Sequence, residues 1–207
     1  MKNLILTLFF SLTAILSFGQ DLNALTDEIA TSIELDEAQT KALKTQMEKY
    51  TISLQLIFDK YEEAEPDPQA MLTDIKHARE DYYKALKNDI GKEKFKAYEA
   101  YTDQVKLEVL SEAAGLRLLD LQDPLKMTDD QVTKMKPVMG KAMKGIMETL
   151  MQYIDKPMNV RTKLKVANSL KSIKKTMDRE TAEILTQEQI KKWEEMKEAA
   201  KAEAEKQ

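Results

Sequence analysis

The residue types that most often carry catalysis are scarce in this sequence. His77 is the only histidine and no cysteine is present. No serine lies in a glycine-bounded turn that could form a nucleophile elbow. The carboxylates Glu62, Glu63 and Glu65 cluster before Pro66, but solvated charge is ordinary at a helix end and loop. We therefore expect no enzyme activity, no cofactor and no metal site.

Methionine is the residue whose spacing is most informative. Five methionines recur every four residues from 135 to 151. Because an α-helix has 3.6 residues per turn, each step rotates the side chain by about 40°. We expect Met135 and Met139 to pack in a core, with the later members rotated progressively away from it.

Three interpretations of this methionine ladder stay open. All five residues fill a core or a dimer seam, or the later ones form a flexible apolar surface for varied partners, or the thioethers capture cuprous ion. Gly140 and Gly145 lie beside that surface. In the second interpretation the residues that bind client polypeptides are Met143, Met147, Met151, Lys141 and Lys144.

Four short segments have the composition of a helix start. In three of them an N-cap residue is followed three positions later by glutamine, the pattern of a capping box, and is preceded by an apolar residue. The capping motifs are Leu35, Asp36 and Gln39; Met127, Thr128 and Gln131; and Leu185, Thr186 and Gln189. The fourth segment, Ile90-Gly91-Lys92-Glu93-Lys94, keeps only the apolar residue and the helix start.

The spacing of these segments indicates an internal duplication. Leu35 and Ile90 lie 55 residues apart, Met127 and Leu185 lie 58 apart, and Leu35 and Met127 are offset by 92. A fixed offset of this kind is the sequence signature of a repeated structural unit. We expect two tandem helical units, residues 20–125 and 126–207, the second ending in a charged C-terminal tail.

Apolar residues between the motifs follow the three-to-four spacing of amphipathic helices. With only five glycines, five prolines and 33% charged residues, and without strand-like alternation, the chain is predicted to be all-α, built from long antiparallel helical hairpins. Turns are expected near Pro66-Asp67-Pro68 and Asp155-Lys156-Pro157, and a boundary at Asp123-Pro124. The last helical seam before the Leu185 motif is predicted to comprise Val160, Leu164, Ala167, Leu170, Ile173, Met177 and Ile184.

The N-terminus has the pattern of a secretory signal peptide. Lys2 precedes an apolar run over residues 4–16, and Ser17 and Gly19 provide a small-residue exit. The run is short for a membrane span. We expect residues 1–19 to be removed near Gly19/Gln20, leaving an exported protein with no stable membrane insertion and, without cysteine, no disulfide.

Charge is distributed unevenly along the expected mature chain. Residues 20–125 hold 13 basic and 23 acidic side chains, whereas residues 126–207 hold 18 and 13. The first unit is therefore acidic and the second basic. An exported protein has little occasion to meet nucleic acid, so we do not expect a nucleic-acid partner despite the local basicity.

Leu185-Thr186-Gln187-Glu188-Gln189 resembles the motif that defines the LTxxQ family, the Spy/CpxP-like periplasmic proteins, and the motifs at Met127 and Leu35 are conservative variants. The resemblance implies a periplasmic helical-hairpin protein of the stress response. Family members carry two motifs per chain and form an intertwined curved dimer. With the unit duplicated, one chain could form an intrachain pseudo-dimer, so a monomeric pseudo-dimer and a homodimer both stay open.

Two binding functions follow from this resemblance. In the first, the protein is an ATP-independent chaperone whose partners are unfolded or misfolded periplasmic proteins. In the second, it is a regulator that docks on the periplasmic domain of a sensor kinase in an envelope-stress pathway. We expect the chaperone function, because the methionine and lysine residues offer an adaptable amphipathic face.

Overall fold

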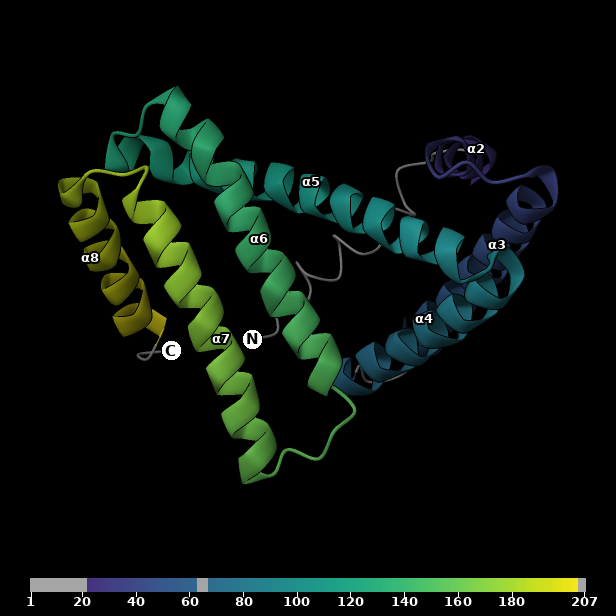
Figure 1. Ribbon diagram of the computed structural model, residues 1–207. Helices are drawn as coiled ribbons and strands as arrows, with labels where there is room; N and C mark the ends of the chain where they lie inside the picture. Colours follow the sequence, from purple (N-terminus) through teal and green to yellow (C-terminus); the bar gives the residue numbers. More distant parts are fainter. Residues whose placement is uncertain (1–21, 63–66, 205–207) are drawn as a thin grey trace. The chain divides into compact units, whose positions relative to one another are not determined.

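The structure is a computed structural model that describes residues 22–62 and 67–204, and within these ranges every regular element is an α-helix (Figure 1). The all-α prediction is confirmed. The predicted signal peptide, together with Glu63 and Glu65, lies outside the described residues. The helices are α2 (Leu22–Ser32), α3 (Glu37–Glu62), α4 (Pro68–Ile90), α5 (Lys92–Leu125), α6 (Asp129–Tyr153), α7 (Val160–Ala182) and α8 (Gln187–Ala204).

The chain divides into two compact units. The first ends at Val105 and also takes in Leu150–Pro157, and the second comprises Lys106–Thr149 and the chain from Met158. This division differs from the expected one after residue 125. The reason is that α5 and α6 are both continuous helices, each of which contributes one part to the first unit and another to the second.

The first unit is built on the predicted hairpin of α3 and α4, which lie side by side in Figure 1. Asp67 starts α4 by accepting hydrogen bonds from the amides of Gln69 and Ala70, with Pro68 at the first helical position, where its missing amide proton costs nothing. The predicted apolar spacing produces the core. Its buried residues on the hairpin include Leu43, Met47, Leu54, Ile75, Tyr82 and Leu86.

Tyrosines fill the middle of this core. The ring of Tyr82 stacks on Tyr50 at 4.9 Å between centroids, and its hydroxyl lies 2.9 Å from that of Tyr98. Burial raises the pKa of Tyr50 to about 12 and moves the pKa values of Tyr82 and Tyr98 upward as well. These phenols stay neutral at physiological pH, so they serve packing and hydrogen bonding rather than proton transfer.

A buried lysine attaches the segment Leu150–Pro157 to the hairpin of the first unit. The Lys76 ammonium lies 2.6 Å from the Asp155 carboxylate, and the side-chain amide of Gln69 donates to the Ile154 carbonyl at 3.2 Å. Met151 completes the contact by packing with Leu54 and Ile75. The segment is therefore held by one small apolar cluster, one ion pair and one hydrogen bond.

The core of the second unit gathers around the starts of α6 and α8. It contains Leu118 and Leu125 from α5, Met127, Val132 and Met135, and Leu185, with Trp193 and Met196 of α8 packed against it. Gly140 lets α6 approach α5 closely, because an added Cβ would lie 2.3 Å from the Ser111 hydroxyl and 2.9 Å from its Cα. The predicted turn near Asp155-Lys156-Pro157 is confirmed, since α6 ends at Tyr153 and α7 begins at Val160.

We predict that Asp155→Asn lowers the thermal midpoint of the first unit, whereas Lys76→Met does not. The asparagine variant leaves a mostly buried ammonium without its nearest counter-ion, and the methionine variant replaces the ammonium with an apolar group of similar length. Circular dichroism melts check this. Equal losses in the two variants would show that the ion pair itself stabilises the unit.

The Lys76–Asp155 pair should make part of the stability of the first unit sensitive to acid. The hydrogen bond from Lys76 lowers the pKa of Asp155, so the ionised carboxylate stabilises the unit fully above the unfolded pKa of about 3.9. This stabilisation is lost as the pH falls through the lowered folded pKa. Wild-type protein should therefore lose more stability below about pH 4 than Asp155→Asn. Parallel pH titrations of the two proteins measure the difference.

Candidate functional site

The three predicted capping boxes are all present. In each box the N-cap side chain accepts a hydrogen bond from the backbone amide of the glutamine, at 2.8 Å for Asp36 and Gln39, 3.2 Å for Thr128 and Gln131, and 3.3 Å for Thr186 and Gln189. The side-chain carbonyl of the glutamine in turn accepts from the backbone amide of the N-cap residue, at 3.1, 3.0 and 2.9 Å. The sequence pattern therefore identified the starts of α3, α6 and α8.

In the second unit the two glutamines also bind each other. Gln131 and Gln189 exchange hydrogen bonds between their side-chain amides at 2.9 and 3.1 Å. The second N–H of Gln131 reaches the Ile184 carbonyl, and that of Gln189 reaches the Lys126 carbonyl. With the N-cap bonds, every donor and acceptor of both amides is used. The sequence did not reveal that the two motifs would meet.

The first unit contains a related pair in which lysine stands where a glutamine would be. Gln39 donates to the Ile90 carbonyl at 3.0 Å, and the Lys94 ammonium donates to the Ile33 carbonyl at 2.9 Å. Lys94 is the fifth residue of the divergent fourth segment. Its departure from glutamine therefore removes the amide pair but keeps a side-chain bond to the opposite turn.

Two of the turns before the capping boxes adopt left-handed backbone at residues other than glycine. Glu34 and Lys126 have φ of 55° and 52°. The backbone amide of the residue after each one donates to a carbonyl in the last turn of the preceding helix. These bonds run from Leu35 to Ala30 and from Met127 to Gln122. These are the bonds of a Schellman motif. Neither position carried the glycine that would have indicated it from sequence.

The methionine ladder has mixed burial. Met135 is fully buried and Met139 packs against the same cluster, as predicted, while Met143 and Met147 are half-buried. The hypothesis that Met151 lies on an exposed surface is wrong, because its side chain is only 6% exposed. Its rotation away from Met139 turns it toward Leu54 and Ile75 rather than toward solvent.

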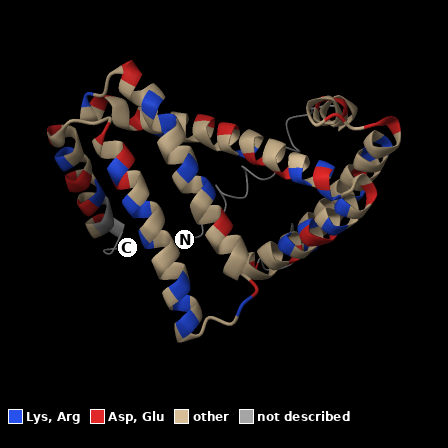
Figure 2. Ribbon diagram, viewed as in Figure 1, with Lys and Arg blue, Asp and Glu red and all other residues tan. Residues whose placement is uncertain are grey.

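Exposed apolar side chains of the second unit lie instead on α7, as well as on α5. Only Thr181 of this helix is buried, and the exposed fractions of Val160 and Leu164 are 75% and 58%. The prediction that Val160, Leu164 and Ala167 pack in a hairpin seam is therefore wrong. Figure 2 shows Lys and Arg along the same helix, which has six basic and no acidic residues between 160 and 175.

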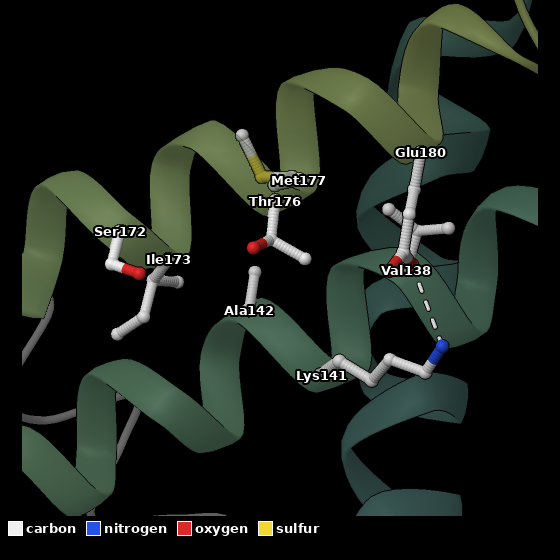
Figure 3. A pocket seen from close by; sticks show the side chains of 8 residues that line it. All are labelled: Val138, Lys141, Ala142, Ser172, Ile173, Thr176, Met177 and Glu180. Atoms are coloured by element: carbon white, nitrogen blue, oxygen red, sulfur yellow. Dashed lines mark hydrogen bonds and ion pairs between the residues drawn. The ribbon is translucent and has the colours of Figure 1, made fainter.

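A pocket of about 170 Å³ lies between α6 and α7 (Figure 3). Val138, Ala142, Ile173 and Met177 form its apolar lining. Cavities on the order of 150 Å³ hold a benzene-sized group, so the pocket can accept one apolar side chain. Its polar lining residues are Lys141, Ser172, Thr176 and Glu180.

The two lysines predicted to border a client surface have acidic neighbours. The Lys141 ammonium lies 3.4 Å from the Glu180 carboxylate at the pocket, and Lys144 lies 3.6 Å from Glu148. The glycines expected beside the methionine surface instead lie at helix contacts. Gly140 is buried against Ser111, and a Cβ on Gly145 would lie 3.1 Å from Ile173.

Little in the described part of the chain suggests other chemistry. His77 is exposed. Residues 22–62 and 67–204 contain no group of three or more histidines and carboxylates placed to hold a metal ion. Over the same ranges, no helix has the length and hydropathy needed to cross a bilayer. The features that remain are the exposed apolar residues of α3, α5 and α7, the basic residues of α7, and the pocket.

We predict that Gln131→Ala and Gln189→Ala each lower the stability of the second unit by about 1–2 kcal/mol. Each substitution removes the hydrogen bond from the backbone amide of the N-cap threonine and leaves the other glutamine side chain without its partner. Gln187→Ala is the matched control, since this exposed glutamine lies two positions from Gln189 on the same helix. Chemical denaturation in which all three variants behave alike would exclude a structural role for the amide pair.

We further predict that Met151→Asp destabilises the first unit by about 3–5 kcal/mol, because it places an uncompensated charge in a packed cluster. Met158→Asp should change the midpoint little, because Met158 is 55% exposed. Thermal melts of the two variants compare a buried and an exposed methionine under the same substitution. A wild-type melt for Met151→Asp would contradict the burial of this residue.

Comparison with known proteins gave no match for this chain among family models, curated proteins or solved structures.

Proposed function

We propose that this protein binds unfolded or partly folded segments of other polypeptides outside the cytoplasm, as an ATP-independent chaperone. The observation that carries the proposal is α7, a 23-residue helix of which only one residue is buried. Val160 and Leu164 of this helix lie in water, and clustered exposed apolar side chains commonly mark binding sites.

The chemistry of α7 suits polypeptide segments of varied sequence. Val160, Leu164 and the nearby Met158 offer apolar contact, and methionine adapts its shape to different partners. The surrounding lysines and arginines attract segments that carry carboxylates along with apolar residues.

This client surface differs from the one expected at the methionine ladder. Met151 is excluded by its burial, and Met143 and Met147 contribute at most their half-exposed parts. Lys141 instead lines the pocket, which lies on the opposite side of α7, since Ile173 projects about 180° from Leu164 around the helix. The site therefore moves from the last turns of α6 to the exposed side of α7.

Two features of the sequence support the rest of the proposal. Residues 1–19 have the pattern of a signal peptide, and the paired capping motifs resemble those of the Spy/CpxP-like periplasmic proteins. The sequence contains no glycine-rich phosphate loop. Binding and release of clients would then depend on affinity alone, without a nucleotide cycle.

The test is an aggregation assay with residues 20–207 and several unrelated unfolding proteins, without nucleotide. We predict that wild-type protein slows aggregation at an equimolar ratio and that Val160→Asp with Leu164→Asp abolishes most of this effect. Both substitutions add charge to exposed positions, so they remove apolar contact with clients and leave buried packing intact. The thermal midpoint should stay within about 2 °C of wild type.

The matched control is Ile52→Asp with Leu56→Asp, which adds the same charge at two equally exposed positions on α3. If this control loses as much suppression of client aggregation as the α7 variant does, α7 is not the site. Wild-type protein that protects no client would refute chaperoning. A regulator that docks on one sensor domain would then be the leading hypothesis.

A further inference from the structure

An acidic and apolar face lies exposed on the part of α5 that belongs to the second unit. Leu116 and Leu119 are 69% and 56% exposed. Glu112, Asp120 and Asp123 are exposed too, and they project within about 60° of Leu116 around the helix. We name these five residues the acidic face. Glu112 also pairs with Lys136 at 2.9 Å, so Asp120 and Asp123 are the carboxylates on which the charge of this face mainly depends. A pair of exposed leucines bordered by carboxylates resembles half of an interface.

A face of opposite charge lies on α7. Val160, Leu164, Lys171 and Lys175 are all exposed and project within about 40° of Leu164. We name these four residues the basic face. Its apolar residues come first and its lysines follow, in the same order as Leu116 and Asp123 on α5.

The two faces match in spacing as well as in charge. Leu164 and Lys171 are seven residues apart on α7, and Leu116 and Asp123 are seven apart on α5. Seven residues advance an α-helix by about 10 Å and return nearly to the same side. Two such helices side by side in parallel would place leucine against leucine and lysine against aspartate at once.

From this complementarity we propose that the partner of the acidic face is the basic face of a second copy of this chain. The contact is heterologous, because it joins two different surfaces. One pair of short helical faces is smaller than a standard interface, so the association is weak and reversible. Because the opposed charges are exposed, it weakens as salt is added.

The self-association has a consequence that rests on the proposed function. The basic face shares Val160 and Leu164 with the client surface, so a second copy that covers it also blocks clients. At high protein concentration a second copy would then cover the client surface, and a client would have to compete with that copy for the surface. Self-association is measured without any client, so its failure and the failure of chaperoning are separate results.

Charge reversal tests the proposal. Sedimentation velocity of residues 20–207 at low salt should show concentration-dependent association, weakened about tenfold by Lys171→Glu with Lys175→Glu. Asp120→Lys with Asp123→Lys should weaken it to the same extent. An equimolar mixture of these two variants should associate again, because the acidic α7 of one meets the basic α5 of the other.

The control is Lys163→Glu with Lys165→Glu, which changes the net charge equally but lies about 100° from Leu164 on either side. By itself this control should associate as wild type does, because both of its faces are intact. The α5 variant, with its client surface uncovered, should also suppress aggregation at least as well as wild type at high concentration.

Several results would overturn the proposal. These are a wild-type chain that stays monomeric up to about 100 μM at low salt, association that the control substitutions weaken as much as the Lys171/Lys175 reversal does, and a mixture of the two reversals that does not recover. Binding of a monomeric wild-type chain to anionic phospholipid vesicles through α7 would identify a membrane surface as the partner instead.

Discussion

A pair of side-chain amides fixes the architecture of the second unit. Gln131 and Gln189 each cap their own helix, each bond a carbonyl of the opposite turn, and bond each other. A buried or half-buried side-chain amide costs folding free energy when its hydrogen bonds are incomplete, and it specifies one arrangement of the helices when they are complete. The arrangement therefore requires the starts of α6 and α8 to lie together, and the chain between them must return to close that distance.

The apolar core of the unit follows from this constraint. Met127 and Leu185, which precede the two N-caps, are buried in one cluster with Val132 and Met135. Packing is thus densest where the helix starts meet, and it thins along α7 toward Val160. The exposed apolar residues of α7 lie at the end farthest from the amide pair in sequence. The C-terminal end of α7 is therefore packed, with Thr181 buried, whereas its N-terminal end leaves Val160 and Leu164 exposed. This arrangement suits a surface that must remain available to partners.

The first unit shows how the same plan tolerates variation. Lys94 replaces a glutamine and Gly91 replaces an N-cap hydroxyl or carboxylate, yet side chains still bond the opposite turns. A lysine can donate but cannot accept, so the closed amide pair is lost. The aromatic cluster of Tyr50, Tyr82, Phe95 and Tyr98 supplies dense packing at the corresponding end.

The sequence by itself determined the local structure of this protein. Apolar spacing predicted the helices, and the Asp36, Thr128 and Thr186 boxes located three of their starts, because capping depends on residues only three positions apart. Contacts between distant segments could not be predicted in this way. Helix geometry places Met151 about 120° from Met139 around α6, and so correctly predicted that Met151 points away from the core of the second unit. Only the tertiary structure showed that α3 and α4 pack against Met151. Likewise the amphipathic pattern of α7 predicted a buried seam, and only the packing of its neighbours left Val160 and Leu164 in solvent. A periodic pattern defines a face of a helix, whereas long-range packing decides whether that face is covered.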